Sequence, residues 1–336
     1  MESLAVALAA LLIAGPVTAA EKLPPLTLSG QGSFFVGGKD IRSPATTSRA
    51  TGPTDGTIMT AQVYVHYQIP AKAGKRKAIT FIHGCCLTGK TWETTPDGRM
   101  GWDEYMLRQN YPVYVIDQAW RGRSAIDPTS LNSVKLGREK AESLPTVNAA
   151  SHEGAWTLFR FGTKYPEPNP GLQFPLEAQA ELWKQMVPDW SGTLGPANPT
   201  VPALAELADK IDGTVLISHS QSGIFPFQAA ALSRKGIAGI VAIEPAACPA
   251  ATDAMTPYAN LPILVMFGDF LAGTSWGETL KKCQAFAQAA NAAGGKVEVV
   301  ALPDVGFHGN SHMLMQDKNS LDVAKWLAKW IDTRVR

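Results

Sequence analysis

Short apolar runs, several of them separated by segments with helical periodicity, limit most strongly how this chain can fold. A run that is apolar at consecutive positions predicts a strand buried on both faces, and alternation with helices predicts a mostly parallel sheet covered by helices. We therefore predict the α/β fold class. The buried runs are residues 78–82, 113–116, 214–218, 237–243, 263–267 and 297–302, and the clearest helical segments are residues 280–293 and 321–331. An earlier stretch, residues 61–69, alternates polar and apolar side chains and predicts a half-buried strand.

The N-terminal segment has the pattern of a secretory signal peptide. Residues 4–14 are apolar, Gly15 and Pro16 interrupt them, and small residues follow up to Ala20, although Glu2 stands where a basic residue is usual. We predict a signal peptide over residues 1–20, a single domain over residues 21–336, and a periplasmic or secreted protein. No other segment has the length of apolar sequence that is needed to span a bilayer.

The charge balance narrows the class of partner. The formal net charge is +1 and the sequence contains no basic run. This argues against nucleic acid or an anionic membrane as the main partner, because both need a concentration of positive charge. The expected ligand is a small molecule without strong charge.

Between residues 127 and 202 the alternation of strand and helix patterns stops, and Pro, Gly, Asn and Trp become frequent. A structureless loop of this length is uncommon within a compact domain, so we expect an insertion with short helices of its own. Such an insertion is expected over the carboxyl edge of the sheet, where α/β folds bind ligands. Its aromatic residues either line a ligand pocket or pack the insertion onto the body; they include Trp156, Phe159, Phe161, Phe174, Trp183 and Trp190.

The sequence SHSQSG joins the apolar run 214–218 directly to a helical segment, with Ser220 at the turn. This is the position of a nucleophile in a strand-to-helix elbow, which needs small residues two positions to either side. Here those residues are Ser218 and Ser222, followed by Gly223. The alternative is that Ser220 only caps the following helix.

Three further turns match one fold. The run 78–82 ends in His83-Gly84-Cys85, which is typical of a turn that donates an N–H to an oxyanion. The run 113–116 is followed by residues 117–124, which resemble the DxxGxGxS turn with Trp120 in place of the first glycine. A histidine-bearing loop, residues 304–312, precedes the last helix. Together with the elbow, these turns predict an α/β-hydrolase fold with a serine nucleophile.

The sequence resembles the α/β-hydrolase serine esterases, and within them the bacterial esterase 713 group. The motifs that carry the resemblance are HGCCLTGKTWETTPDGRMGWDEY, SHSQSG, the IEP of residues 243–245 and GNSHMLMQD. The resemblance implies a serine carboxylesterase with the catalytic triad Ser220, Glu244 and His312. It also implies a disulfide between Cys85 and Cys86 beside the oxyanion hole, and a homodimer.

Two members of this triad have alternatives. Most α/β-hydrolases place the acid after the next strand, where this sequence offers Asp269, whereas the resemblance selects Glu244. His308 and His312 lie in the same loop, and the GNSH motif selects His312. The acid must come within hydrogen-bonding distance of the histidine to hold its tautomer.

The four cysteines allow three pairings in an oxidising compartment. If Cys85 pairs with Cys86, then Cys248 and Cys283 form the second bridge. Closing a ring between neighbours strains the chain, because a trans peptide holds their Cα atoms about 3.8 Å apart and disulfides usually need about 4.4 to 6.8 Å. Two reduced thiols in a tight turn are the alternative.

The expected mechanism is acyl transfer through a covalent intermediate. Ser220 would attack an ester carbonyl, and the backbone N–H groups of Cys85 and Gln221 would bind the oxyanion. The histidines lack metal-ligand spacing, so neither a metal nor a cofactor is expected. A lactonase or amidase with the same triad is the nearest alternative, and a non-catalytic α/β-hydrolase-fold binding protein is a more distant one.

Overall fold

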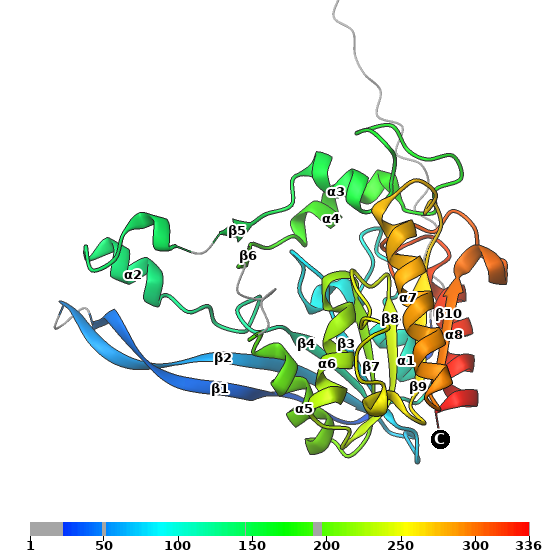
Figure 1. The fold of residues 1–336 in the computed structure, drawn as a ribbon, viewed down its shortest axis with the longest axis horizontal. Coiled ribbons are helices and arrows are strands. Elements are labelled where there is room, and N and C mark those ends of the chain that lie inside the picture. Colours follow the sequence, from blue (N-terminus) through cyan, green and yellow to red (C-terminus); the bar gives the residue numbers. More distant parts are fainter. Residues whose placement is uncertain (1–22, 49–51, 145, 191–196, 336) are drawn as a thin grey trace, which may run out of the picture.

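The computed structural model of the protein describes residues 23–48, 52–144, 146–190 and 197–335. The expected signal peptide, residues 1–20, lies outside the described residues. An eight-stranded sheet with the order β1-β2-β4-β3-β7-β8-β9-β10 forms the centre of the molecule (Figure 1). The pairs from β4 to β10 are parallel, and β1 and β2 join antiparallel at one edge, so the predicted mostly parallel sheet is confirmed.

The strand bounds follow the apolar runs closely. Each of the six buried runs predicted from the sequence is a strand whose ends lie within one residue of the prediction. Agreement is this close because these strands are buried on both faces and end where polar or turn residues begin. The strands are β3 (Ala78–Ile82), β4 (Val113–Asp117), β7 (Thr214–His219), β8 (Ile237–Ile243), β9 (Pro262–Phe267) and β10 (Lys296–Ala301).

Helices cover both faces of the sheet and divide the core into two layers. Successive strand residues point to opposite faces, so that Phe81 packs in one layer and Ile82 in the other. The first layer includes α1 (Trp102–Arg108) and α8 (Ser320–Arg334). The second includes α5 (Thr200–Lys210), α6 (Phe225–Leu232) and α7 (Ser275–Ala292). The short 3-10 helices are η1 (Gly89–Trp92), η5 (Ser220–Ile224), η6 (Thr256–Tyr258) and η7 (Leu302–Val305).

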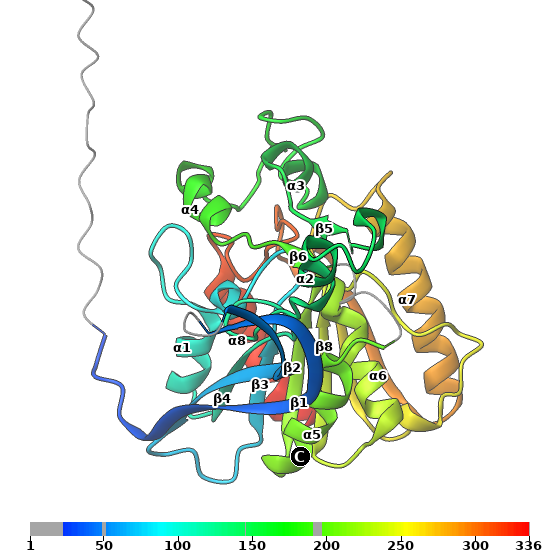
Figure 2. The same ribbon diagram turned by 90° about the vertical axis from the view of Figure 1, so that its left-hand side faces the viewer.

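Between β4 and α5 the chain leaves the sheet and forms short elements of its own, and we call residues 127–202 the insertion. Two of its helices, α3 and α4, lie above the sheet in both views (Figures 1 and 2). The short strands β5 and β6 pair antiparallel. Its elements are α2 (Thr129–Lys135), η2 (Ala141–Ser143), β5 (Val147–Asn148), α3 (His152–Leu158), η3 (Leu176–Ala178), α4 (Gln179–Lys184) and β6 (Asp189–Trp190).

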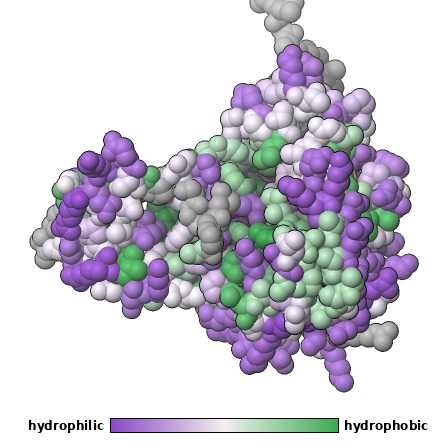
Figure 3. Space-filling view, in the orientation of Figure 1, coloured by the Kyte–Doolittle hydropathy of each residue, from purple (hydrophilic) through white to green (hydrophobic). Residues whose placement is uncertain are grey.

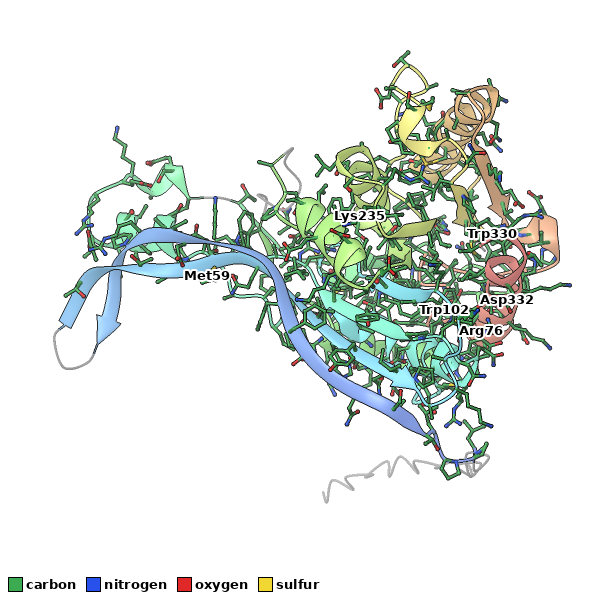
Figure 4. The ribbon with its side chains drawn as sticks, turned by 90° about the horizontal axis from the view of Figure 1, so that it is seen from below. Met59, Arg76, Trp102, Lys235, Trp330 and Asp332 are labelled. Atoms are coloured by element: carbon green, nitrogen blue, oxygen red, sulfur yellow. A yellow bond between two sulfur atoms is a disulfide. The ribbon has the colours of Figure 1, made fainter. Side chains whose placement is uncertain are left out.

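Strands β1 (Leu28–Ser48) and β2 (Gly52–Pro70) are much longer than the single strand 61–69 that the sequence predicts. The apolar alternation is lost in their outer halves, at Gly37-Gly38 for example, although backbone pairing continues there. We call residues 39–48 and 52–60 the arm. With α2, the arm forms a lobe beside the body, and Met59 lies on it (Figures 3 and 4). Hydrogen bonds tie α2 to β1, such as the one from Thr129 to Ser43 at 3.1 Å.

Within the described residues, no helix combines the length and the apolar character that crossing a membrane requires.

Candidate active site

Ser220 occupies a sharp turn between β7 and α6. All of β7 is buried, and Ser220 follows it with φ of 58°, a left-handed conformation that is uncommon for residues other than glycine. Close approach of the neighbouring turn depends on Gly84, because a Cβ atom there would lie 2.8 Å from Cβ of Ser220. Gly223 likewise lets Pro245 approach, since a Cβ at this position would lie 2.3 Å from Cβ of Pro245. The tight turn that the sequence predicts is therefore present.

The serines that flank the elbow hold it through hydrogen bonds. The hydroxyl of Ser222 accepts the N–H of His219 at 3.2 Å and lies 3.2 Å from the carbonyl oxygen of Ile82, at the end of β3. The hydroxyl of Ser218 lies 3.5 Å from the carbonyl oxygen of Val241. These serines thus link the elbow to both neighbouring strands, which glycine in the same positions would not do.

His312 lies against the elbow, in a loop whose own side chains hold it together by hydrogen bonds. The carboxylate of Asp317 accepts hydrogen bonds from the N–H and hydroxyl of Ser311, at 2.8 and 2.7 Å, and from the amide of Asn310 at 3.0 Å. The Nε2–H of His219, next to Ser220, donates to the carbonyl oxygen of His312 at 2.9 Å. The loop therefore carries His312 to the position next to the elbow.

The two nitrogens of the His312 ring differ. Nδ1 lies 3.1 Å from Oε2 of Glu244, whereas Nε2 is buried and has no hydrogen-bond partner among the described residues. Trp276 and Phe159 enclose the ring, with centroid distances of 4.2 and 5.5 Å. Burial lowers the pKa of His312, the hydrogen bond with Glu244 opposes this effect, and the charge of Arg160 adds to it. The ring is therefore neutral near pH 7, with one nitrogen available as a base.

Glu244 follows β8 with φ of 50° and is fully buried. Its carboxylate accepts hydrogen bonds from His312, from the backbone N–H of Gly268, and from two guanidinium nitrogens of Arg160 at 2.5 and 2.9 Å. Burial acts to raise the pKa of Glu244, but the charge of Arg160 and the hydrogen bond from His312 outweigh it and lower the pKa to about 2. Glu244 is an anion at any working pH.

The alternative residues for the acid and the base take other positions. The carboxylate of Asp269 accepts the N–H groups of Phe270 and Gly309 at 2.7 and 2.9 Å, and no hydrogen bond joins it to His312 within the described part of the chain. His308 is exposed in the loop before His312. The geometry thus brings Glu244, and not Asp269, into contact with His312.

The turn after β3 lies beside the elbow. His83 is buried, which lowers its pKa to about 4, and its Nδ1–H donates to the carbonyl oxygen of Gly84 at 2.9 Å. Arg121 donates to the same carbonyl at 2.8 Å and to the side-chain oxygen of Gln221 at 2.6 Å. The N–H of Cys85 makes no hydrogen bond to any other described residue.

The four cysteines form two pairs of neighbours. Cys248 and Cys283 form a disulfide. Cys85 and Cys86 are not bonded to each other in the structure, and their Sγ atoms lie 2.7 Å apart, longer than a disulfide bond and closer than unbonded sulfur atoms normally approach. The disulfide between Cys85 and Cys86 stays a prediction.

Three charged residues of the site were not predicted from the sequence. Arg160 pairs with Glu244, and Arg121 forms a fully buried ion pair with Asp189. Arg160 and Asp189 belong to the insertion, where no periodic pattern marks them. The usable signal was local: Arg160 stands between two phenylalanines, and Asp189 between a proline and a tryptophan, where a lone charge needs a partner.

The aromatic residues of the insertion mostly pack it onto the body. Trp156, Phe159, Phe161 and Phe174 are buried in the same layer as Phe81, and Phe159 also contacts His312. Trp183 is half-buried and stacks on His152. The same side chains therefore pack the insertion onto the body and enclose the site.

Among the described residues, one group has atoms close enough together to hold a metal ion: Cys85, Cys86 and Asp189, whose ligand atoms lie within 4.8 Å of one another. Asp189 already pairs with Arg121 and accepts a hydrogen bond from the side chain of Gln221 at 2.8 Å. The carboxylate is thus engaged in holding the two turns together.

The chain is similar to known proteins over most of its length. No protein-family model matches the chain. A solved structure, described as the atomic resolution structure of a novel bacterial esterase, is 55% identical, covers 95% of this chain and 100% of its own, and superposes with a TM-score of 0.90. A fungal protein named "Probable secreted lipase phiG" is 28% identical over an alignment of 323 positions, which covers 80% of this chain and 85% of the fungal protein. Since identity of 55% extends over nearly the whole length, the chain belongs to the α/β-hydrolase esterases and is a carboxylic ester hydrolase.

Proposed function

We propose that this esterase acts through the triad Ser220, His312 and Glu244. The observation that carries the proposal is the position of the His312 ring, with Nδ1 bound to Glu244 and Nε2 buried without a partner among the described residues, against the elbow that bears Ser220. Nε2 removes the proton of the Ser220 hydroxyl as its oxygen attacks the ester carbonyl. Glu244 holds the tautomer and stabilises the imidazolium that forms.

The tetrahedral oxyanion is bound by the backbone N–H groups of Cys85 and Gln221. Support comes from the contact between their two turns, which a Cβ at Gly84 would prevent. His312 then protonates the leaving alcohol, the acyl group remains on Ser220, and water attacks the acyl-enzyme with His312 again as the base. No step needs a cofactor.

We propose a single catalytic domain over residues 21–336 in which the insertion caps the site. Arg160 and Phe159 reach the triad from the insertion, which supports this role. The enclosure favours small esters with apolar groups over long or charged substrates.

Variants of Ser220 test the mechanism. Wild type and Ser220→Ala are assayed against p-nitrophenyl esters of increasing acyl length, with lactones and anilides to separate the esterase from a lactonase or an amidase. Loss of the nucleophile is expected to lower kcat about 10⁴- to 10⁶-fold on every ester. A fluorophosphonate that labels the wild type and not Ser220→Ala would identify Ser220 as the nucleophile without a rate measurement. Full activity in Ser220→Ala would refute the mechanism.

Export is proposed as well. The apolar N-terminal segment, the disulfide between Cys248 and Cys283, and the name of the secreted fungal relative support it. N-terminal sequencing of enzyme from the periplasm or medium is expected to begin at Ala20 or Glu21. An uncleaved enzyme confined to the cytoplasm would contradict it.

A homodimer formed through the arm and α2 completes the proposal. These segments project from the body and expose apolar side chains, with Met59, Leu131 and Leu136 at 52%, 38% and 42% exposure. The partner is a second copy of the chain. Light scattering after size-exclusion chromatography should give twice the chain mass for the wild type and one chain mass for Met59→Glu/Leu131→Glu, with Leu232→Glu, 64% exposed at the end of α6, as the control that stays dimeric.

A further inference from the structure

We propose that Arg160 is a positioning residue of this active site, which fixes the carboxylate of Glu244 and sets the net charge of the Glu244–His312 pair. The inference rests on the proposed triad and deepens it. The insertion would then supply part of the catalytic machinery in addition to covering it.

The geometry of Arg160 is bidentate. Its two terminal nitrogens donate to the two oxygens of Glu244, at 2.9 and 2.5 Å, while its Nε donates to the carbonyl oxygen of Asp269 at 2.8 Å. A planar guanidinium that meets both oxygens leaves the carboxylate little rotational freedom. Oε2, the oxygen that faces His312, is thus held in place by a group outside the proposed triad.

The backbone of Arg160 is also held. Arg160 follows α3 with φ of 58°, and the side-chain amide of Asn169 donates to its carbonyl oxygen at 2.9 Å. The guanidinium lies 5.8 Å from the ring of Trp276, which also packs on His312. Only 2% of the residue is exposed. A buried arginine in a left-handed conformation is costly, and such features persist mainly where function requires them.

Arg160 changes the proton balance of the pair beside it. With Arg160 present, the guanidinium and the Glu244 carboxylate sum to zero charge before His312 takes a proton. Without Arg160 the buried pair would carry one negative charge and would bind a proton at higher pH, whichever of the two groups takes it. Arg160 therefore keeps His312 in the basic form at lower pH than a carboxylate–histidine pair alone would.

Other titratable groups face this pair from the neighbouring elements. His219, at the end of β7, lies 4.7 Å from the His312 ring, and burial lowers its pKa to about 3, so that it stays neutral. His83, after β3, is neutral for the same reason. Asp269, after β9, is bound by two backbone N–H groups. Burial raises the pKa of Asp317, in the His312 loop, to about 7, so Asp317 titrates in the range of interest.

The test compares Arg160→Met, which removes the charge at similar length, with Arg160→Lys, which keeps the charge and loses the bidentate geometry. The acidic limb of kcat/KM is expected to move upward by roughly one to three pH units in Arg160→Met, and to stay near that of the wild type in Arg160→Lys. We expect kcat to fall about 10²-fold in Arg160→Met and less in Arg160→Lys. Arg334→Met, at an exposed pair with Glu298, is the matched control that should change neither quantity.

Side-chain nitrogen spectra of histidine-labelled enzyme separate His312 from Asp317, with the His312 signal assigned from His312→Gln. The His312 signal should titrate at higher pH in Arg160→Met than in the wild type. If Arg160→Met does not fold, Arg160→Lys is compared with the wild type instead. A purely structural role predicts that Arg160→Lys is less stable but keeps the kcat of the wild type. The positioning role predicts that kcat falls while KM is unchanged. An unshifted limb in folded Arg160→Met, with an unshifted His312 signal, would overturn the role of Arg160 alone. Full activity of Glu244→Gln would instead overturn the triad on which the inference rests.

Discussion

Arg121 and Asp189 form an ion pair in which neither side chain is exposed to solvent. Arg121 follows β4 in the body, and Asp189 lies in β6 of the insertion, 68 residues later. The pair also engages both turns that would bind the oxyanion. Arg121 holds the carbonyl of Gly84 and the side chain of Gln221, while Asp189 accepts from Gln221 and from the thiol of Cys85 at 3.3 Å. Two turns from distant parts of the chain are thus fixed relative to one ion pair.

The first prediction concerns this pair. Asp189→Asn leaves Arg121 buried with its charge uncompensated, which should lower the free energy of unfolding by about 3 to 5 kcal/mol. It should also lower kcat, because the proposed oxyanion donors, the N–H groups of Cys85 and Gln221, would lose the ion pair that holds both of their turns. Urea unfolding and steady-state kinetics measure the two effects. The control is Glu167→Gln, which breaks the exposed pair with Lys164 and should cost less than about 1 kcal/mol. An Asp189→Asn variant as stable as this control would contradict the prediction.

The second prediction separates the two carboxylates. Glu244→Gln keeps the size of the side chain but removes the charge beside His312, and should lower kcat about 10⁴-fold. Asp269→Asn should lower kcat less than about tenfold, because its carboxylate binds backbone N–H groups and not the histidine. Initial rates on one ester at saturation decide between them. The reverse order of effects would assign the acid to Asp269.

The third prediction is the position of the acidic limb in the wild type. The proposed base, His312, can accept a proton only when neutral, so activity should be present above its pKa and lost as the pH falls through it. Burial lowers this pKa below 6.5, and the midpoint of the limb in kcat/KM should therefore lie below pH 6.5. Rates measured in buffers of constant ionic strength from pH 4 to 9 check this. A midpoint above pH 7 would mean that the charge of Glu244 outweighs burial and Arg160 together.

The fourth prediction concerns the disulfide. The bond between Cys248 and Cys283 closes a loop with a sequence separation of 35. Removing it in Cys248→Ala/Cys283→Ala should lower the free energy of unfolding by about 3 to 4 kcal/mol, through greater chain entropy in the unfolded state. Because neither cysteine contacts Ser220 or His312 in the described hydrogen bonds, kcat at 25 °C should stay within about twofold. Reductant should then have no further effect on the stability of the double variant.

Much of the fold could be predicted because strands that are buried on both faces are visible in the sequence as continuous apolar runs. Runs such as residues 237–243 are apolar on both faces and end where the chain must turn, so their bounds follow from composition. The same rule places Ser220 and Glu244 at one edge of the sheet, since both directly follow neighbouring parallel strands. The outer halves of β1 and β2 could not be predicted in this way, because exposed strands held by backbone hydrogen bonds need no apolar pattern.

The charged residues around the site lie beyond this rule. Arg160 and Glu244 are 84 residues apart. Because the insertion has no regular hydrophobic pattern, its sequence does not predict which residue of the body pairs with each of its charged residues. The residues that directly follow the strands could be predicted, whereas the ion pairs between the insertion and the body could not.

The insertion contributes one member to each of two buried ion pairs, Arg160 to Glu244 and Asp189 to Arg121. Exchanging the whole insertion for that of another hydrolase would therefore leave an unpaired anion and an unpaired cation in the body, at a cost of several kcal/mol each. New substrate ranges in this lineage are more readily reached by point substitutions among the other residues of the insertion. A directed-evolution library built on this enzyme should accordingly hold positions 160 and 189 constant and vary the residues around them.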